Sequence, residues 1–365
     1  MRRQLRLSPY SGGVFHQMPL VQAVLEPVLG TSPLPAPLRA GLCAVVYIIA
    51  DLLAAMFLRG LVVRLQPPHV APVVVVPGKP PALSPLPPDA ALAALALNPF
   101  TLLACVSRST TVFFRLFVAA SLYFGLHRRP VACGVTLAAT VYLNPHAAPL
   151  LGVPLGLCCR QHWVQFVAGV GAAAAALAAA SSAVHGDLGE AVASSFLWRV
   201  SFADCTPHAN MFWYLFAEVF GRFRTYFVRV CQAHPYVYLT PLTLRFHRQP
   251  GLLFTISFAV MVLTTPFNTV ADTTLAAVLM CAHGGPLARL YPHVYFWAII
   301  LFGVTVLMPV MGRLWLAAAG GNSNFSFNMS MVSTLAGGIL VGAFTAASIR
   351  DAREARHAAA IAKNE

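Results

Sequence analysis

The run AGLCAVVYIIADLLAAMFL, residues 40–58, decides the fold class of this chain. An α-helix needs about 20 mostly apolar residues to cross the hydrocarbon core of a bilayer. This run supplies them, with Asp51 as its only charged residue. A helix at the surface of a soluble domain would instead carry a polar face. The run therefore predicts a membrane-spanning helix.

Composition extends this prediction to the whole chain. Of its 365 residues, 58% are hydrophobic and 10% are charged, whereas soluble domains carry about 25% charged residues. Apolar runs recur from Leu42 to Ala347 with no long polar block between them. We expect a single membrane domain over residues 1–365. Its predicted fold is all-α, a polytopic bundle of transmembrane helices of which several are short or broken.

Apolar stretches with polar or aromatic edges predict the individual spans. They lie at 40–58, 111–126, 131–158, 163–184, 209–231, 251–265, 267–283, 293–318 and 328–348. The third span is interrupted by NPHAAP (144–149), because broken helices are tolerated at membrane depth where they face protein or a cavity. Residues 66–89 are too rich in proline to continue a helix. We predict a loop there, in which VAPVVVVP (70–77) is compatible with a surface strand.

Basic residues set the expected orientation. The net charge is +13, which in a soluble protein would suggest nucleic-acid binding. In a membrane protein, Lys and Arg instead gather in cytosolic loops and near lipid headgroups, so we expect no nucleic-acid partner. Arg59 and Arg64 follow the first span, and Arg350 and Arg353 follow the last. Both of these helix ends are therefore predicted to face the cytosol.

The domain boundaries follow from that orientation. Residues 1–39 become a luminal loop, residues 40–348 the transmembrane bundle, and residues 349–365 a cytosolic tail. The luminal loop contains SPYSGGVFHQMPL (8–20), which lacks the apolar core of a signal peptide. The three arginines ahead of it would stay in the cytosol by the same charge rule. We therefore expect a spanning helix upstream of Met1 in the natural protein.

Four segments are similar, in order, to those of a known family. They are SPYSGGVFHQMPL (8–20), LNPFTLLACVSRST (97–110), ADCTPHANMFWYLFAEVFGRFRTYF (203–227) and AAAGGNSNFSF (317–327). Together they resemble the class U subunit of the glycosylphosphatidylinositol (GPI) transamidase, from Ser8 to about Arg350. Two departures are visible: Ala203 replaces the family's proline before Asp204, and HAN (208–210) replaces its Asn-x-Gly.

This resemblance implies a function. The transamidase of the endoplasmic reticulum membrane removes a C-terminal signal from a protein and joins the new carboxyl terminus to the ethanolamine of a GPI lipid. Its class U subunit is a multi-pass, non-catalytic member that recognises the lipid, and the cysteine-protease-like catalytic chain is separate. The implied partners are the other transamidase subunits, the GPI lipid and the membrane. We expect no catalytic residue, cofactor or metal here, and the eight cysteines show no metal-ligand spacing.

Candidate lipid-binding residues lie in FWYLFAEVF (212–220). Three phenylalanines recur four residues apart, as they would on one stripe of a helix through 209–231, and a tryptophan lies beside them. These residues are Phe212, Phe216, Phe220 and Trp213. The stripe predicts a groove wall for acyl chains, with ordinary helix packing as the alternative.

Glu218 lies in the same stretch. An acid within a span costs roughly 2.5–3.5 kcal/mol and usually faces a partner or a cavity. We interpret Glu218 as part of the lipid groove, paired inside the bundle with Arg222 one turn further on. A purely internal salt bridge stays open as the alternative.

The loop GGNSN (320–324) offers polar contacts. Asn322 and Asn324 flank Ser323 after two glycines, and asparagine amides both donate and accept hydrogen bonds. The resemblance implies contact with the GPI head group at both asparagines. The alternative is a turn that caps the last helix.

Three further polar residues receive structural interpretations. Asp51 and Asp272 lie in apolar runs, so we expect them to tie helices together or to pair with Arg115. For His16 we favour a histidine hydrogen-bonded within a rigid Pro/Gly loop over a ligand of a substrate phosphate.

An enzyme is the alternative function. The class U family is related in architecture to multi-spanning GPI mannosyltransferases, which use a dolichol-linked sugar and carry luminal acids that act as general base or metal ligands. This chain has no Asp-x-Asp motif, and its first 25 residues contain no acid. A transporter would also have broken helices, but no internal repeat indicates one.

Overall fold

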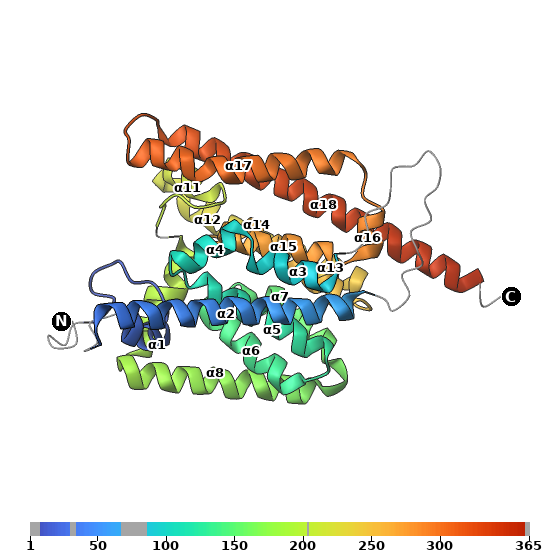
Figure 1. The fold of residues 1–365 in the computed structure, drawn as a ribbon, viewed down its shortest axis with the longest axis horizontal. Coiled ribbons are helices and arrows are strands. Elements are labelled where there is room, and N and C mark those ends of the chain that lie inside the picture. The colour runs from blue at the N-terminus through green and yellow to red at the C-terminus, as the bar shows by residue number, and fades with distance from the viewer. Residues whose placement is uncertain (1–7, 30–33, 67–85, 203, 362–365) are drawn as a thin grey trace.

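The computed structural model describes residues 8–29, 34–66, 86–202 and 204–361. Every regular element within these ranges is a helix, and they contain no strand. The longest helices lie roughly along one common axis, and their chains run in both directions along it (Figure 1). The predicted all-α bundle is therefore confirmed, while its likeness to mannosyltransferases stays a prediction.

Four of the described helices are long and apolar enough to cross a bilayer. They are α2 (Ala36–Leu65), α8 (Trp163–His185), α17 (His293–Leu316) and α18 (Ser323–Ile361). The shortest, α8, has 23 residues, which at the usual rise per residue is about 34 Å and exceeds the ~30 Å hydrocarbon core. Each of the four contains, or nearly coincides with, a span predicted from the sequence.

Shorter apolar helices fill the middle of the bundle. They are α5 (Thr111–Leu126), α6 (Pro130–Leu143), α7 (Ala147–Cys158), α14 (Pro250–Thr264) and α15 (Val270–Cys281). The predicted break at NPHAAP separates α6 from α7. Asn144 is extended there, and its Oδ1 accepts a hydrogen bond of 3.2 Å from the backbone N–H of His146. A second broken unit pairs α3 (Pro88–Ala96) with α4 (Pro99–Val106) at a bend of 45°.

The remaining helices are short or peripheral. They are α1 (Pro19–Leu29), α9 (Leu188–Val192), α10 (Trp198–Ser201), α11 (Phe212–Glu218), α12 (Gly221–Val237), α13 (Leu239–Phe246) and α16 (Gly284–Ala288), with single helical turns at Arg160–His162 and Ala193–Leu197.

The span predicted at 209–231 is wrong. It is divided into α11 and α12, because Val219 and Phe220 are both extended, with ψ of 129° and 132°. Gly221 and the arginines after it continue as a separate helix, α12, which carries polar residues along its length. Two such extended residues redirect the chain, so α11 and α12 cannot present one continuous face.

Both ends of the expected bundle also differ in detail. The stretch predicted as a luminal loop, 1–39, contains the helix α1. Residues 349–361, predicted as a tail, continue α18, because their alanine, arginine and glutamate residues favour helix. Most of the predicted Pro-rich loop, including the possible strand at 70–77, lies outside the described residues.

The main apolar core lies where α2, α5, α7, α14 and α15 meet. Within the bundle Arg115 is fully buried on α5, and its Nη2 lies 3.0 Å from Asp51 Oδ1 on α2. The predicted tie between these helices is thus confirmed. Helices α6 and α8 pack closely because Gly134 on α6 has no side chain where it meets α8. A Cβ at this position would clash with the carbonyl oxygen of Phe166 on α8.

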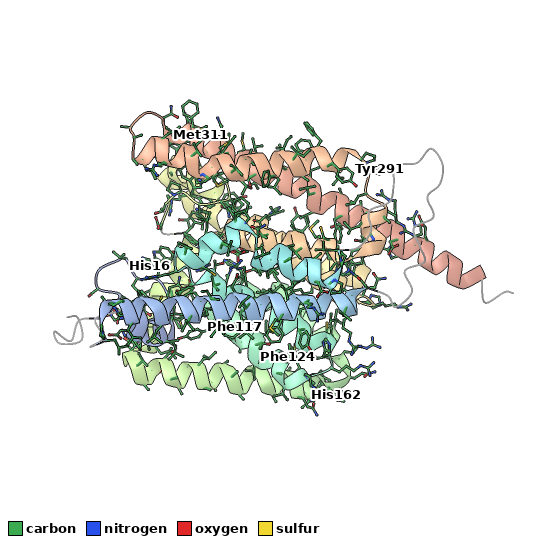
Figure 2. All side chains as sticks on the ribbon, in the orientation of Figure 1. His16, Phe117, Phe124, His162, Tyr291 and Met311 are labelled. Atoms are coloured by element: carbon green, nitrogen blue, oxygen red, sulfur yellow. The ribbon has the colours of Figure 1, made fainter. Side chains whose placement is uncertain are left out.

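The helix ends form two opposite ends of the molecule (Figure 2). One end holds His16 and Met311, and we call it the motif end. The other holds His162 and Tyr291, and we call it the basic end. The C-terminal end of α2 lies at the basic end, where Arg64 Nε donates to His127 Nε2 at 3.4 Å. The assignment of the motif end to the lumen stays a prediction.

Candidate functional site

The aromatic residues of FWYLFAEVF are mainly packing residues in the described chain. Phe212, Trp213 and Phe216 are only 8%, 3% and 2% exposed and form a cluster with Phe202 and Val228. The indole Nε1 of Trp213 donates to the Ser330 hydroxyl on α18 at 3.3 Å. The cluster therefore attaches α11 to the first turns of α18, and contact between these side chains and acyl chains stays a prediction.

The expected stripe and the expected ion pair are both wrong. Phe220 follows the end of α11 and is 80% exposed, so it does not continue the buried face of Phe212 and Phe216. Glu218 is exposed and makes no ion pair or hydrogen bond with any described residue. The reason is the break after α11, which leaves Glu218 on the surface of the chain, where a carboxylate needs no buried partner.

Asn322 and Asn324 lie at the start of α18 and are both exposed. Asn322 Oδ1 accepts a hydrogen bond of 3.0 Å from the backbone N–H of Asn324, which is the geometry of a helix N-cap. Asn324 Oδ1 accepts a hydrogen bond of 2.6 Å from the Tyr214 hydroxyl on α11. The capping alternative thus describes Asn322, and the structure brings the asparagine loop together with the aromatic stretch.

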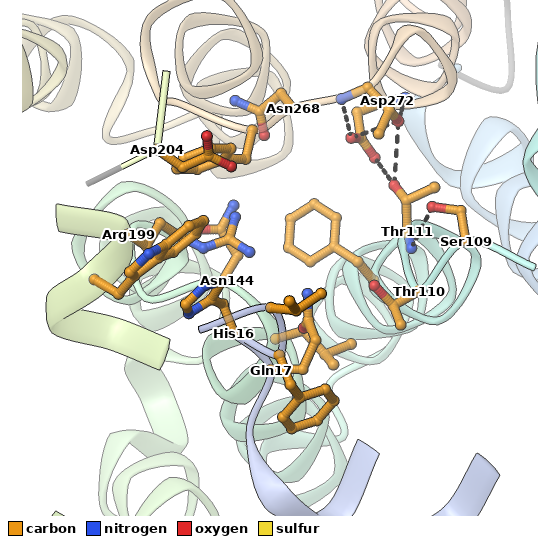
Figure 3. A pocket seen from close by; sticks show the side chains of 17 residues that line it. His16, Gln17, Ser109, Thr110, Thr111, Asn144, Arg199, Asp204, Asn268 and Asp272 are labelled. Atoms are coloured by element: carbon orange, nitrogen blue, oxygen red, sulfur yellow. Dashed lines mark hydrogen bonds between the residues drawn. The ribbon is translucent and has the colours of Figure 1, made fainter. Parts of the chain in front are cut away.

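A polar cavity of about 390 Å³ opens at the motif end (Figure 3). Its lining comes from the opening segment, the start of α5, the α6–α7 break, α10 and the α14–α15 connection. The polar residues among them are His16, Gln17, Ser109, Thr110, Thr111, Asn144, Arg199, Asp204, Asn268, Thr269 and Asp272. Arg199, Asn144 and His16 lie together on the side of the cavity opposite Thr111 and Ser109 (Figure 3).

Arg199 supplies the cavity with an unpaired positive charge. Its guanidinium makes no hydrogen bond or ion pair with any described residue, and its Cζ lies 5.6 Å from the centre of the Phe267 ring. Burial lowers the pKa of Arg199 to about 10, with the Asp272 charge acting in the opposite direction. The side chain is therefore cationic at neutral pH and free to bind an anion.

His16 holds the opening segment in place. Its Nδ1 lies 3.0 Å from the carbonyl oxygen of Ser194, and its Nε2 lies 3.0 Å from that of Gly13. The ring also stacks on Trp198 with the centroids 3.8 Å apart. Both ring nitrogens are thus occupied by protein, as expected for a histidine fixed within its loop. The opening segment forms the rim of the cavity next to Arg199.

The carboxylates of the cavity are already hydrogen-bonded. Asp272 caps α15, accepting from the backbone N–H of Thr269 at 2.8 Å, and it also accepts from the Thr111 hydroxyl at 2.7 Å. Asp204 accepts from the backbone N–H of Thr206 at 2.8 Å. The predicted role of Asp272 as a tie between helices is confirmed, and neither acid forms an ion pair with Arg199.

An apolar groove of about 560 Å³ adjoins the polar cavity. The two share Ser109, Thr111, Asn268 and Thr269. The groove is lined mainly by apolar residues of α4 and α17, among them Phe100, Leu103, Met308, Pro309 and Leu316. A polar cavity with a free cation, adjacent to an apolar groove, matches a molecule that has an anionic group next to hydrocarbon chains.

All four segments quoted from the sequence meet at this pair of cavities. Residues 14–17 and 109–110 line the polar cavity, with Asp204 from the third segment. Phe100, Pro207 and Ser326, from the second, third and fourth segments, line the groove. Segments far apart in the chain thus share one site.

Comparison with known proteins gives the family. A family model described as GPI transamidase subunit PIG-U matches residues 1–333, most of the chain. The chain belongs to the PIG-U family. The matched region includes all four of the segments that meet at the two cavities, so the resemblance deduced from them is confirmed.

Individual relatives of this PIG-U family member carry related names. The GPI transamidase component GAB1 of Saccharomyces cerevisiae is 30% identical over 247 residues, which cover 66% of this chain and 62% of the yeast protein. The human GPI-anchor transamidase component PIGU is 25% identical over 367 residues, covering 95% of this chain and 82% of the human protein. The GAB1 homolog of Schizosaccharomyces pombe is 24% identical over 344 residues, covering 90% and 78%.

The polar cavity of this PIG-U family member was not predicted from the sequence. The four family segments were identified, but no binding role was expected for Asn144, Arg199 or Asn268. Two signals were available. Arg199 lies in the apolar stretch FLWRV (196–200), where a charge usually faces a cavity. Asn144 begins the break in a predicted span, and such breaks usually face protein or a cavity as well.

Proposed function

We propose that this chain is a non-catalytic subunit of a GPI transamidase in the endoplasmic reticulum membrane, and that it binds the GPI lipid. The lipid joins acyl chains to a phosphate, a glycan and ethanolamine. The apolar groove suits the acyl chains, and Arg199 suits the phosphate, because a guanidinium binds phosphate oxygens with two parallel hydrogen bonds.

The observation that carries this proposal is Arg199, which has no ion-pair partner among the described residues and lines the polar cavity. Three of the four family segments reach this cavity, and the fourth reaches the adjoining groove. Asn322 and Asn324 lie close to the groove, since Ser326 of the same helix lines it, and their amides suit sugar hydroxyls or the ethanolamine phosphate. Phe212, Trp213 and Phe216 then support this surface from within. The exposed Phe220 and Glu218 are proposed to contact the lipid or a neighbouring subunit.

A non-catalytic role agrees with the state of the cavity's acids. A general base must have a carboxylate oxygen free to approach the proton that it removes. Both carboxylate oxygens of Asp272 already accept hydrogen bonds, from Thr111 and from Thr269, whereas at Asp204 only Oδ1 accepts, from its own turn. The enclosed state of Asp272 favours lipid binding over the alternative, sugar transfer from a dolichol-linked donor.

Affinity purification of the tagged full-length protein from a mild detergent tests the proposal. We expect other transamidase subunits to co-purify, together with GPI lipid detectable by mass spectrometry after extraction. A protein recovered alone that transfers mannose from a dolichol-linked donor would overturn it. A complex recovered with all its subunits but no more GPI lipid than a control membrane protein would overturn the lipid-binding part alone.

A further inference from the structure

A second cavity, of about 610 Å³, lies at the basic end, far from the site described above. Three turns meet around it: the α5–α6 turn, the α7–α8 turn and the α13–α14 turn. Its basic or imidazole side chains are Arg128, Arg160, Arg248, His162 and His247, the thiols of Cys158 and Cys159 also line it, and no acid is among the described residues around it. Figure 2 places His162 at this end, opposite His16.

The three arginines of this cavity have no ion-pair partner among the described residues. The acids of the same end are already occupied: Asp89 pairs with Arg59 at 2.6 Å, and Asp351 and Glu354 pair with Arg289 at 2.6 and 2.7 Å. The arginines around the cavity therefore differ from their neighbours, because their charges converge on a hollow without being neutralised.

The backbone conformation of Arg128 is a second unusual feature of this cavity. Its φ is +54°, a left-handed conformation that favours glycine and strains a residue with a Cβ. The turn holds it there by a hydrogen bond from its N–H to the Gly125 carbonyl at 3.3 Å. This turn therefore fixes the backbone of Arg128 beside the cavity that its side chain lines.

The surroundings of the cavity indicate a lipid headgroup as its occupant. Leu157, Pro130 and Pro250 give it an apolar floor. Trp163, which is 61% exposed, follows directly after Arg160 and His162 at the start of a membrane-spanning helix, and exposed tryptophans at helix ends lie at the level of the lipid headgroups. The hollow is therefore placed where an anionic phospholipid can enter it from the bilayer.

We propose that this basic cavity binds the headgroup of an anionic phospholipid that carries a phosphomonoester, from the leaflet at the basic end. Several arginines around one hollow match a headgroup with more than one negative charge. This site takes a different lipid from a different end of the molecule than the GPI site does, and neither proposal depends on the other.

The test measures binding of fluorescent phosphatidylinositol 4-phosphate to the detergent-purified complex, with phosphatidylcholine and inorganic phosphate as separate competitors. We expect the wild-type complex to bind the probe, with little competition from either. Arg160→Gln with Arg248→Gln should weaken binding about 25-fold, at about five-fold per arginine. The matched control is Arg59→Gln with Arg353→Gln, which removes the same charge from exposed residues of the same end outside the cavity, and it should change binding less than two-fold.

Arg128→Gly separates binding from folding. Glycine is favoured at this φ, so the variant should be at least as resistant to heat as the wild type while binding the probe about five-fold less tightly. Equal binding by the cavity variant and its control would overturn the proposal. So would equal affinity for phosphatidylcholine, full competition by inorganic phosphate, or a segment of a partner subunit filling the cavity in the assembled complex.

Discussion

The Tyr214 hydroxyl donates a hydrogen bond of 2.6 Å to Asn324 Oδ1 and joins two segments that lie 110 residues apart. The Tyr214 ring also stacks on Phe327, with the centroids 4.3 Å apart. These contacts fix α11 against the first turn of α18, where Asn322 is the N-cap. The aromatic stretch and the asparagine loop, which the sequence suggested as separate lipid contacts, therefore form one surface.

Replacing Tyr214 by Phe should loosen this surface while keeping its packing. The ring and its stacking on Phe327 remain, and one hydrogen bond is lost, which costs about 1 kcal/mol. We expect a small decrease in thermal stability of the purified complex and less co-purified GPI lipid. Tyr238→Phe, which removes a hydroxyl bound to His234 away from this surface, is the control. An unchanged lipid content in Tyr214→Phe would count against a role of this surface in binding.

The double replacement Asn322→Ala with Asn324→Ala should reduce GPI attachment more than it reduces assembly. Loss of the N-cap costs about 1 kcal/mol of helix stability, which a 39-residue helix tolerates. Surface levels of a GPI-anchored reporter measure attachment, and co-precipitation of partner subunits measures assembly. Asn322→Ser with Asn324→Ala keeps a capping side chain and separates the two effects. Normal reporter levels in the double alanine variant would exclude lipid contact by these amides.

The buried pair Asp51 and Arg115 should show strong coupling. Two guanidinium nitrogens of Arg115, Nε and Nη1, have no hydrogen-bond partner in the described part of the chain, so removal of Asp51 would leave a buried charge without compensation. Arg115→Met or Asp51→Leu alone should cost about 3–5 kcal/mol, and the two substitutions together much less. Heat-induced aggregation of the detergent-solubilised protein provides the comparison. Additive losses in the double variant would show that the pair is not coupled.

The fold class and most helix positions could be predicted because both depend on local apolar composition. The span at 40–58 and the break at NPHAAP are local features, and the structure contains both. The false span at 209–231 arose because hydropathy continues through FWYLFAEVFGRF, whereas the break depends on two backbone torsions at Val219 and Phe220. The average hydropathy of a sequence window does not reveal these two backbone torsions.

The polar cavity could not be predicted in the same way. Arg199 lies on the short helix α10, and Asn144 and Asn268 lie in two different helix connections. Only the packing of the bundle brings them together. The sequence indicated that each was unusual in its own apolar surroundings. It could not show that Asp272 would be enclosed by Thr111 and Thr269 rather than paired with Arg115.

The contact between α6 and α8 should depend on Gly134. A Cβ there would lie 2.4 Å from the Phe166 carbonyl oxygen and 2.7 Å from the Val170 nitrogen, and both are backbone atoms that cannot move aside. Gly134→Ala should therefore cost about 1–3 kcal/mol and lower the amount of folded protein. Gly171→Ala, on α8 with no atom within 4 Å of the added Cβ, should be neutral or slightly stabilising. Equal expression and melting of the two variants would contradict this packing.

Arg199 offers the sharpest test of the proposed lipid site, because its charge can be changed without removing any hydrogen bond within the described chain. Arg199→Gln removes the cation, and Arg199→Lys keeps it but loses the planar pair of donors. A charge-assisted contact to phosphate is worth about 1.5–3 kcal/mol. We therefore expect about ten-fold or greater loss of GPI lipid binding for Gln and a smaller loss for Lys. Arg222→Gln, on the exposed face of α12, controls for the change of net charge.

Thermal stability should not fall in Arg199→Gln, because the lost charge is unpaired and its desolvation is unfavourable. If Arg199→Gln instead unfolds the protein, or binds GPI lipid as well as Arg222→Gln does, Arg199 is not the phosphate ligand.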